Sequence, residues 1–132
     1  MTKDKESNHA ISNAKAHLED IVKLHAEHNQ AESQNRREAI EDELRDTALS
    51  IEVRSGWYSP GCDKDEISPE EFMILLTTGG PALRVTGDLR GDQPDCASLQ
   101  WQDWGTPWTD YQLTDEEQTE LDWFASLFYF GE

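Results

Sequence analysis

Pro81-Ala-Leu-Arg-Val-Thr-Gly-Asp-Leu89 and Ala97-Ser-Leu-Gln-Trp-Gln-Asp-Trp104 are the two segments from which the fold class follows most directly. Apolar and polar residues alternate in both, and a period of two is typical of strands with one buried face. Residues 90–95 between them are rich in turn-forming residues, so we predict a β-hairpin. The side chains expected to face the core are Leu83, Val85, Leu89, Leu99 and Trp101.

Two further elements precede this hairpin. Residues 49–55 alternate in the same way and predict another strand. Ser68-Pro69-Glu70-Glu71 then carries a full helix-start pattern, with Ser as the N-cap, Pro at the first helical position and Glu at the third. We therefore predict a helix that begins at Ser68, carries the apolar run 72–76 and ends at Gly79-Gly80-Pro81.

The first 48 residues have helical periodicity instead. Apolar residues recur every three or four positions from about His9 to His25, and again from Ala39 to Ala48. The stretch 29–35 between these segments has no large apolar residue. The simplest arrangement is therefore an antiparallel helical hairpin. One long broken helix is the alternative.

At the other end of the chain, Thr114-Asp-Glu-Glu117 predicts the start of a last helix. The order is then ααβαββα, which is typical of the α+β class. We expect an N-terminal helical hairpin followed by a small antiparallel sheet of about three strands packed with two helices. We divide the chain into a helical N-terminal arm, residues 1–48, and an acidic, aromatic-rich α+β domain, residues 49–132.

The composition is strongly acidic. Among 132 residues there are 28 Asp and Glu but 11 Lys and Arg, for a net charge of −17. This balance argues against direct binding to nucleic acids and to anionic membranes, because both need clusters of basic residues. Apolar runs fall short of the roughly 20 residues that span a bilayer, so we expect a soluble, cytoplasmic protein.

The acids are concentrated in the second part of the chain. Residues 55–132 hold 16 acids and 3 bases, and all twelve aromatic residues lie at or after Trp57. Acidic residues in the first turn of a helix interact favourably with the helix dipole. The remaining acidic residues need another explanation: solubility, adaptation to high salt, or a basic partner. If the reason is a basic partner, we expect the carboxylates to form one continuous surface. That surface would occupy the partner's nucleic-acid-binding site. The carboxylates we assign to this surface are Glu70, Glu71, Asp88, Asp92, Asp95, Asp103 and Asp110.

Three tryptophans fall within eight residues, at positions 101, 104 and 108. One interpretation is an aromatic cluster that locks the end of a strand to the last helix. The other is an exposed anchor for an arginine-rich partner, because an aromatic ring beside a carboxylate stacks well on a guanidinium group. In the second interpretation Trp104 and Trp108 are the anchors.

Metal binding and catalysis have little support in the residues. His25 and His28 are three residues apart, but no cysteine lies near them, so we interpret them as solvated or interhelical side chains rather than zinc ligands. Gly79-Gly80-Pro81 follows a predicted helix instead of opening one, and therefore does not read as a phosphate loop. We predict no cofactor, no metal and no enzymatic activity.

Four segments carry a resemblance: Ser55-Gly-Trp57, Phe72-Met-Ile-Leu-Leu-Thr-Thr-Gly-Gly-Pro-Ala82, Gln102-Asp-Trp-Gly-Thr-Pro-Trp108 and Phe128-Tyr-Phe-Gly-Glu132. Over about residues 51–132 the chain resembles small acidic proteins of unassigned function from bacteriophages and mobile elements of proteobacteria. What the resemblance implies is this genomic context. In charge and size the chain is also similar to the DNA-mimic inhibitors of restriction enzymes and CRISPR complexes.

We therefore predict an anti-defence inhibitor of the anti-CRISPR kind. It would occupy the basic nucleic-acid-binding site of a CRISPR effector or a restriction nuclease of the bacterial host by mimicking DNA. The alternative is a non-enzymatic adaptor or antitoxin-like module that binds one partner through its helices. The N-terminal helices are also candidates for a homodimer contact.

Overall fold

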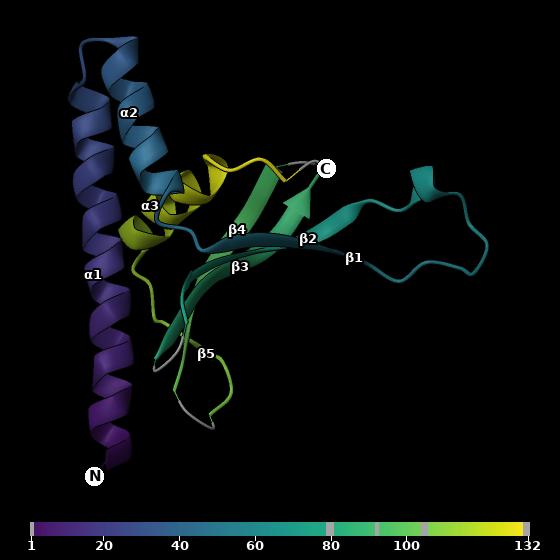
Figure 1. Ribbon diagram of the computed structural model, residues 1–132, viewed down its shortest axis with the longest axis horizontal. Coiled ribbons are helices and arrows are strands. Elements are labelled where there is room, and N and C mark those ends of the chain that lie inside the picture. The colour runs from purple at the N-terminus through teal and green to yellow at the C-terminus, as the bar shows by residue number, and fades with distance from the viewer. Residues whose placement is uncertain (1, 79–80, 92, 104–105, 131–132) are drawn as a thin grey trace.

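The computed structural model describes residues 2–78, 81–91, 93–103 and 106–130, with side chains from residue 9 onward. Within these residues the helices cover one face of an antiparallel sheet in which each strand pairs with its neighbours in sequence (Figure 1). The elements are α1 (Thr2–Gln30), α2 (Gln34–Arg45), β1 (Ser50–Ser55), the 3-10 helix η1 (Lys64–Glu66), β2 (Pro69–Thr77), β3 (Ala82–Arg90), β4 (Gln93–Gln102), β5 (Thr109–Asp110) and α3 (Asp115–Ser126). The α+β class is confirmed. The prediction of about three strands in the order ααβαββα is wrong, because the described sheet has five strands.

The N-terminal helices form the predicted antiparallel hairpin rather than one broken helix (Figure 1). α1 begins at Thr2, earlier than expected, and the polar stretch contracts to a turn of residues 31–33. Ser33 caps α2, since its hydroxyl accepts a hydrogen bond of 3.2 Å from the Arg36 N–H. Among the described residues, no helix combines the length and the apolar character that a membrane crossing requires.

The helix predicted from Ser68 is instead strand β2. The side chains of Phe72, Ile74 and Leu76 are buried while those between them are partly exposed, which is the alternation of a strand. β2 pairs with β1 on one side and with β3 on the other. A helix here would leave the facing backbone groups of both neighbours without partners, so sheet pairing overrides the local helix-start pattern.

The β3–β4 hairpin is confirmed, although β4 begins at Gln93 and the turn is therefore shorter than predicted. The register shifts at Gly87, opposite Cys96, which adopts a left-handed φ of 51°. α3 stabilises this bulge: Gln118 donates to the Ala97 carbonyl at 2.7 Å, and the Ala97 N–H donates to Asp122 at 2.9 Å. Both backbone groups of Ala97, which the bulge takes out of the regular ladder, are thereby paired.

α3 starts where the capping pattern predicts. The Thr114 hydroxyl accepts from the Glu117 N–H at 3.1 Å, and the Glu117 carboxylate accepts from the Thr114 N–H at 2.9 Å. The same kind of sequence pattern therefore starts a helix at Thr114 and a strand after Ser68.

One hydrophobic core joins the N-terminal helices to the sheet. Residues expected to belong to a helical arm and residues of the sheet pack in a single cluster with α3. Its largest fully buried side chains are Phe124, Leu18, Ile40, Leu44, Ile74, Leu83, Leu99, Leu121 and Val85. The helices of residues 1–48 are thus an integral part of this core.

Candidate interaction surfaces

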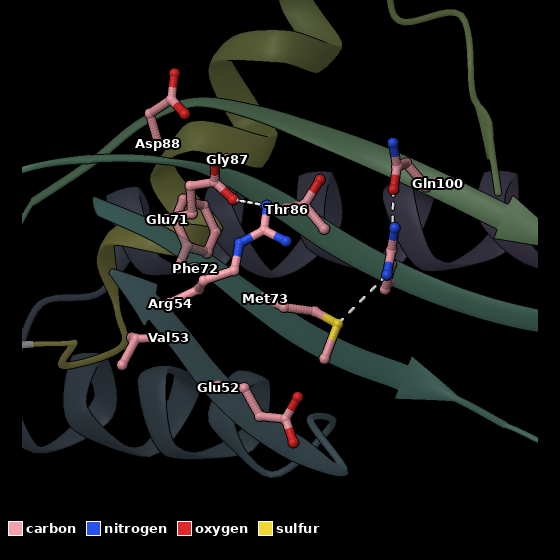
Figure 2. Close-up of a pocket in the computed structure, with 11 residues that line it drawn as sticks. Glu52, Val53, Arg54, Glu71, Phe72, Met73, Thr86, Gly87, Asp88 and Gln100 are labelled. Atoms are coloured by element: carbon pink, nitrogen blue, oxygen red, sulfur yellow. Dashed lines mark hydrogen bonds and ion pairs between the residues drawn. The ribbon is translucent and has the colours of Figure 1, made fainter. Parts of the chain in front are cut away.

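The sheet face opposite the helices carries a groove of about 590 Å³. It forms because polar side chains on this face alternate with the core residues of the same strands. Figure 2 shows Arg54 beside Glu71 at one end and Gln100 at the other, with Met73 and Thr86 between them. The groove is therefore lined by four adjacent strands, β1 to β4, and is open to the exterior.

Arg84 is held firmly in this groove. Its guanidinium carbon lies 4.1 Å from the centre of the Trp108 ring, and its Nε donates to Gln100 at 2.9 Å. Gln100 in turn donates to Asp110 at 2.8 Å. Burial lowers the pKa of the Arg84 guanidinium from its ordinary value, and the positive charge of Arg54 lowers it further. Among the described residues, no carboxylate pairs directly with Arg84.

Trp108 therefore has an intramolecular role that the sequence did not reveal. We predicted it as an anchor for a partner, but it covers Arg84 and is partly buried. The alternation of the strand showed only that Arg84 faces outward. Its stacking on a tryptophan 24 residues later depends on the short pairing of β5 with β4.

A row of carboxylates crosses the sheet at the end where the β3–β4 turn lies. Glu71 of β2 is directly opposite Asp88 of β3, and Asp88 is directly opposite Asp95 of β4. Arg54 forms an ion pair with Glu71, and Arg90 forms one with Asp95 at 3.0 Å. Like charges directly opposite each other on neighbouring strands destabilise a sheet, so folding alone does not favour this row.

The loop between β1 and β2, residues 56–68, projects from the same end of the sheet (Figure 1). We call it the arm. Trp57 in the arm is fully exposed, with 106% of its reference area accessible, and Tyr58 is 58% exposed. Exposed carboxylates follow within a few residues at Asp63, Asp65 and Glu66. The sequence contains the signal for this feature, an aromatic pair in a loop rich in Gly, Pro, Ser and Asp, but we did not assign it a role.

The arm and the carboxylate row together form a surface that we call the acidic end. Its described carboxylates are Asp63, Asp65, Glu66, Glu70, Glu71, Asp88 and Asp95, and its described basic residues are Arg54, Lys64 and Arg90. The negative charge of this surface affects Cys96. The pKa of its thiol is raised chiefly by the charge of Asp95 and by the hydrogen bond to Asp95, and Asp88 makes a smaller contribution. The acidic end is thus a region of concentrated negative charge.

The structure brings together only some of the residues predicted for partner binding. Glu70, Glu71, Asp88 and Asp95 lie at the acidic end, whereas Asp110 lies beside Gln100 at the far end of the groove. Asp103 is 4% exposed, and its carboxylate oxygens have no hydrogen-bond partner among the described residues. In this position its carboxylate does not face the surface. Asp92 and Trp104 lie outside the described residues.

The histidines on α1 connect the helices. His25 stacks on Trp123 of α3 with ring centres 3.9 Å apart, and also contacts Glu120. His28 bonds to Glu41 of α2 at 2.8 Å. Groups of three or more His, Cys, Asp or Glu with the geometry of a metal site do not occur in the part of the chain that the structure describes.

Comparison with known proteins adds no relative to this description. The chain matches no protein-family model, and no curated protein and no solved structure is significantly similar to it. The acidic end and the groove are therefore interpreted from their own geometry.

Proposed function

We propose that this protein is a non-enzymatic inhibitor that binds a cationic, nucleic-acid-binding surface of a partner protein through its acidic end. The partner in this proposal is a host-defence complex, either a CRISPR effector or a restriction nuclease. The context of bacteriophages and mobile elements implied by the resemblance favours this class, and the site of action would then be the bacterial cytoplasm.

The observation that carries the proposal is the exposed Trp57 in the arm. A fully exposed tryptophan keeps its apolar surface in water. Transfer of that surface from water into an interface would be favourable by roughly 25 cal/mol per Å². Tyr58 follows it, and the carboxylates Asp63 and Asp65 lie within the same loop. Tryptophan, tyrosine and arginine are enriched among the residues that dominate binding energy at interfaces, and a guanidinium group stacks favourably on an aromatic ring.

The charge of the acidic end supports a partner that normally binds DNA. Duplex DNA carries one negative charge per roughly 1.7 Å of axis, and its binding sites are lined by Lys and Arg. Arg54 and Arg90 offset two carboxylates of the row, so Asp88 and the arm contribute most of the local negative potential. Long-range electrostatic attraction between the acidic end and a cationic surface would speed association, and it would weaken as the salt concentration rises.

The test compares two variants with the same net charge. The arm variant combines Asp63→Asn, Asp65→Asn and Glu66→Gln in the arm with Glu70→Gln at the adjoining start of β2. The control variant combines four exposed acids of the N-terminal helical hairpin and its turn, Glu19→Gln, Glu32→Gln, Glu38→Gln and Glu43→Gln. The measurement is DNA binding by a defence complex captured from the host with the wild-type protein, at increasing inhibitor concentrations.

We expect the arm variant to inhibit at least about tenfold more weakly than wild type, which corresponds to about 1.4 kcal/mol. Trp57→Ala should have a similar effect, and the control variant should inhibit like wild type. If both fourfold variants lose the same activity, net charge rather than the acidic end is responsible. An affinity that does not change with salt would instead favour the adaptor alternative, with apolar docking through the helices.

A further inference from the structure

The outer edge of β1 is open among the described residues. In the described part of the chain β1 is the first strand of the sheet and pairs only with β2. The N–H and C=O groups of its outer edge are a template for another strand. Edge strands of monomeric proteins are commonly protected by lysine or proline, and residues 50–55 contain neither.

The apolar residues of β1 extend the core face beyond the cover of the helices. Ile51 and Val53 lie directly opposite Ile74 and Phe72 of β2, which are buried. Ile51 and Val53 themselves are 43% and 45% exposed, and Leu49 just before the strand is 59% exposed. The apolar face therefore ends in an uncovered strip along an open edge.

We propose that a second copy of this chain covers this strip, through antiparallel pairing of the two β1 strands about a two-fold axis at Val53. The sequence Ser50-Ile-Glu-Val-Arg-Ser55 is self-complementary in this register. Val53 lies opposite the partner's Val53 on the apolar face. Glu52 lies opposite the partner's Arg54 on the other face, twice by symmetry.

Charge selects this register over its neighbours. A shift by one residue would place the apolar side chains of one strand opposite the polar side chains of the other. An axis at Glu52 would bring two carboxylates directly opposite each other, which is unfavourable. An axis at Ile51 would leave Glu52 and Arg54 without opposite charges and would pair fewer residues of the strand. The axis at Val53 pairs residues 51–55 of the two strands and places Glu52 opposite the partner's Arg54.

This inference goes beyond the proposed function and does not depend on it. Because paired β1 strands run in opposite directions, the dimer would join two sheets into one and carry an arm at each end. Arg54 belongs to both surfaces, so inhibition is tested with the arm residues, such as Trp57, and dimerisation with Val53→Lys, which lies outside the acidic end.

The first experiment measures molar mass by light scattering over a range of protein concentrations. We expect twice the chain mass of 15.1 kDa at high concentration, with dissociation on dilution. Val53→Lys should weaken the dimer at least about tenfold, because the introduced charges face each other across the axis. Val22→Lys on α1, at a residue that is also 42% exposed, should leave the dimer unchanged. A monomer at every concentration overturns the proposal, as does a dimer lost only in the Val22→Lys variant, which would indicate contact through the helices.

The second experiment separates pairing from folding. Glu52→Lys and Arg54→Glu each place like charges across the proposed interface, so each variant alone should be monomeric. An equal mixture of the two should form a heterodimer. The lysine introduced at position 52 then faces the carboxylate introduced at position 54, and Arg54 of the first variant faces Glu52 of the second. A mixture that stays monomeric, although both variants show cooperative thermal unfolding, contradicts the register.

Discussion

Arg84 shows how much of a binding surface depends on contacts between residues far apart in sequence. Alternation along β3 predicts that its side chain faces outward, and this is correct. Its actual environment is set by Gln100 of β4 and by Trp108, which lies just before β5. Because a guanidinium stacked on an aromatic ring and hydrogen-bonded at Nε keeps little rotamer freedom, Arg84 is a fixed positive charge in an otherwise acidic protein.

Gly87 is required by the packing of a neighbouring ring. A Cβ atom at this position would lie 2.7 Å from Cε1 of Phe72 and 3.0 Å from the carbonyl oxygen of Asp95. We expect Gly87→Ala to lower the free energy of unfolding by about 1–3 kcal/mol, the usual cost of overpacking. Urea denaturation checks this.

A double variant identifies the cause. Phe72→Leu removes the ring atoms that the new methyl group would meet, so Gly87→Ala should cost clearly less in that background. An equal cost in both backgrounds would contradict a clash with the ring and would indicate that the backbone of the bulge is responsible.

His17 makes stability depend on pH. Burial lowers the pKa of the His17 imidazole from its ordinary value near 6.5, and the nearby Asp20 carboxylate opposes this only in part. The unfolded chain therefore binds a proton more readily than the folded chain. The stability associated with neutral His17 is fully present above about pH 6.5 and is lost as the pH falls through the folded pKa.

The prediction concerns the difference between two proteins. His17→Gln cannot be protonated, so the stability of the wild type relative to this variant should decrease between about pH 7 and pH 5. Urea denaturation of both proteins at several pH values measures it. A constant difference across this range would mean that His17 titrates alike in the folded and unfolded states.

At the scale of elements, strand β2 marks the limit of local sequence patterns. Ser68-Pro-Glu-Glu71 and Thr114-Asp-Glu-Glu117 both predict helix starts, and only the second is one. The apolar run after Pro69 is compatible with either structure, and the alternation of buried residues becomes visible only when β1 and β3 lie on both sides. The hairpin of β3 and β4, the paired N-terminal helices and α3 were predictable because periodicity and end signals agree in each.

The candidate site was harder to predict than the fold. Four of the proposed carboxylates meet at one end of the sheet, because they lie next to the ends of paired strands. The exposed aromatic pair in the arm was not predicted, since nothing in the sequence shows whether a loop folds back on the sheet. Asp103 was predicted as exposed but is buried, and the alternation along β4 does not extend to it because the strand ends at Gln102.

The two capping patterns give a direct comparison. Thr114→Ala removes the hydroxyl that accepts from Glu117, and we expect it to lower the free energy of unfolding by about 1 kcal/mol. Ser68→Ala affects an exposed residue before a strand, and we expect a change within about 0.5 kcal/mol. Thermal unfolding of both variants tests this; equal losses would mean that Ser68 does cap a helix.

For the whole molecule, the net charge of −17 opposes the compact state through self-repulsion. Salt screens this repulsion, so raising NaCl from about 0.02 M to about 0.5 M should increase Tm by a few degrees. The increase should be smaller in the control variant, which lacks four acids of the N-terminal helical hairpin and its turn. A Tm that falls with salt would show that ion pairs such as Arg54–Glu71 outweigh the repulsion between carboxylates.

The contact between α1 and α3 also has a consequence for synthesis on the ribosome. His25 meets Glu120, 95 residues further along the chain, and the core needs side chains from both helices. At the usual rate of about 5–20 residues per second, α1 waits for several seconds before α3 has been made. During that interval its apolar stripe is exposed to chaperones and proteases, and a chain truncated before residue 115 would keep that stripe exposed because it lacks the α3 side chains that complete the core.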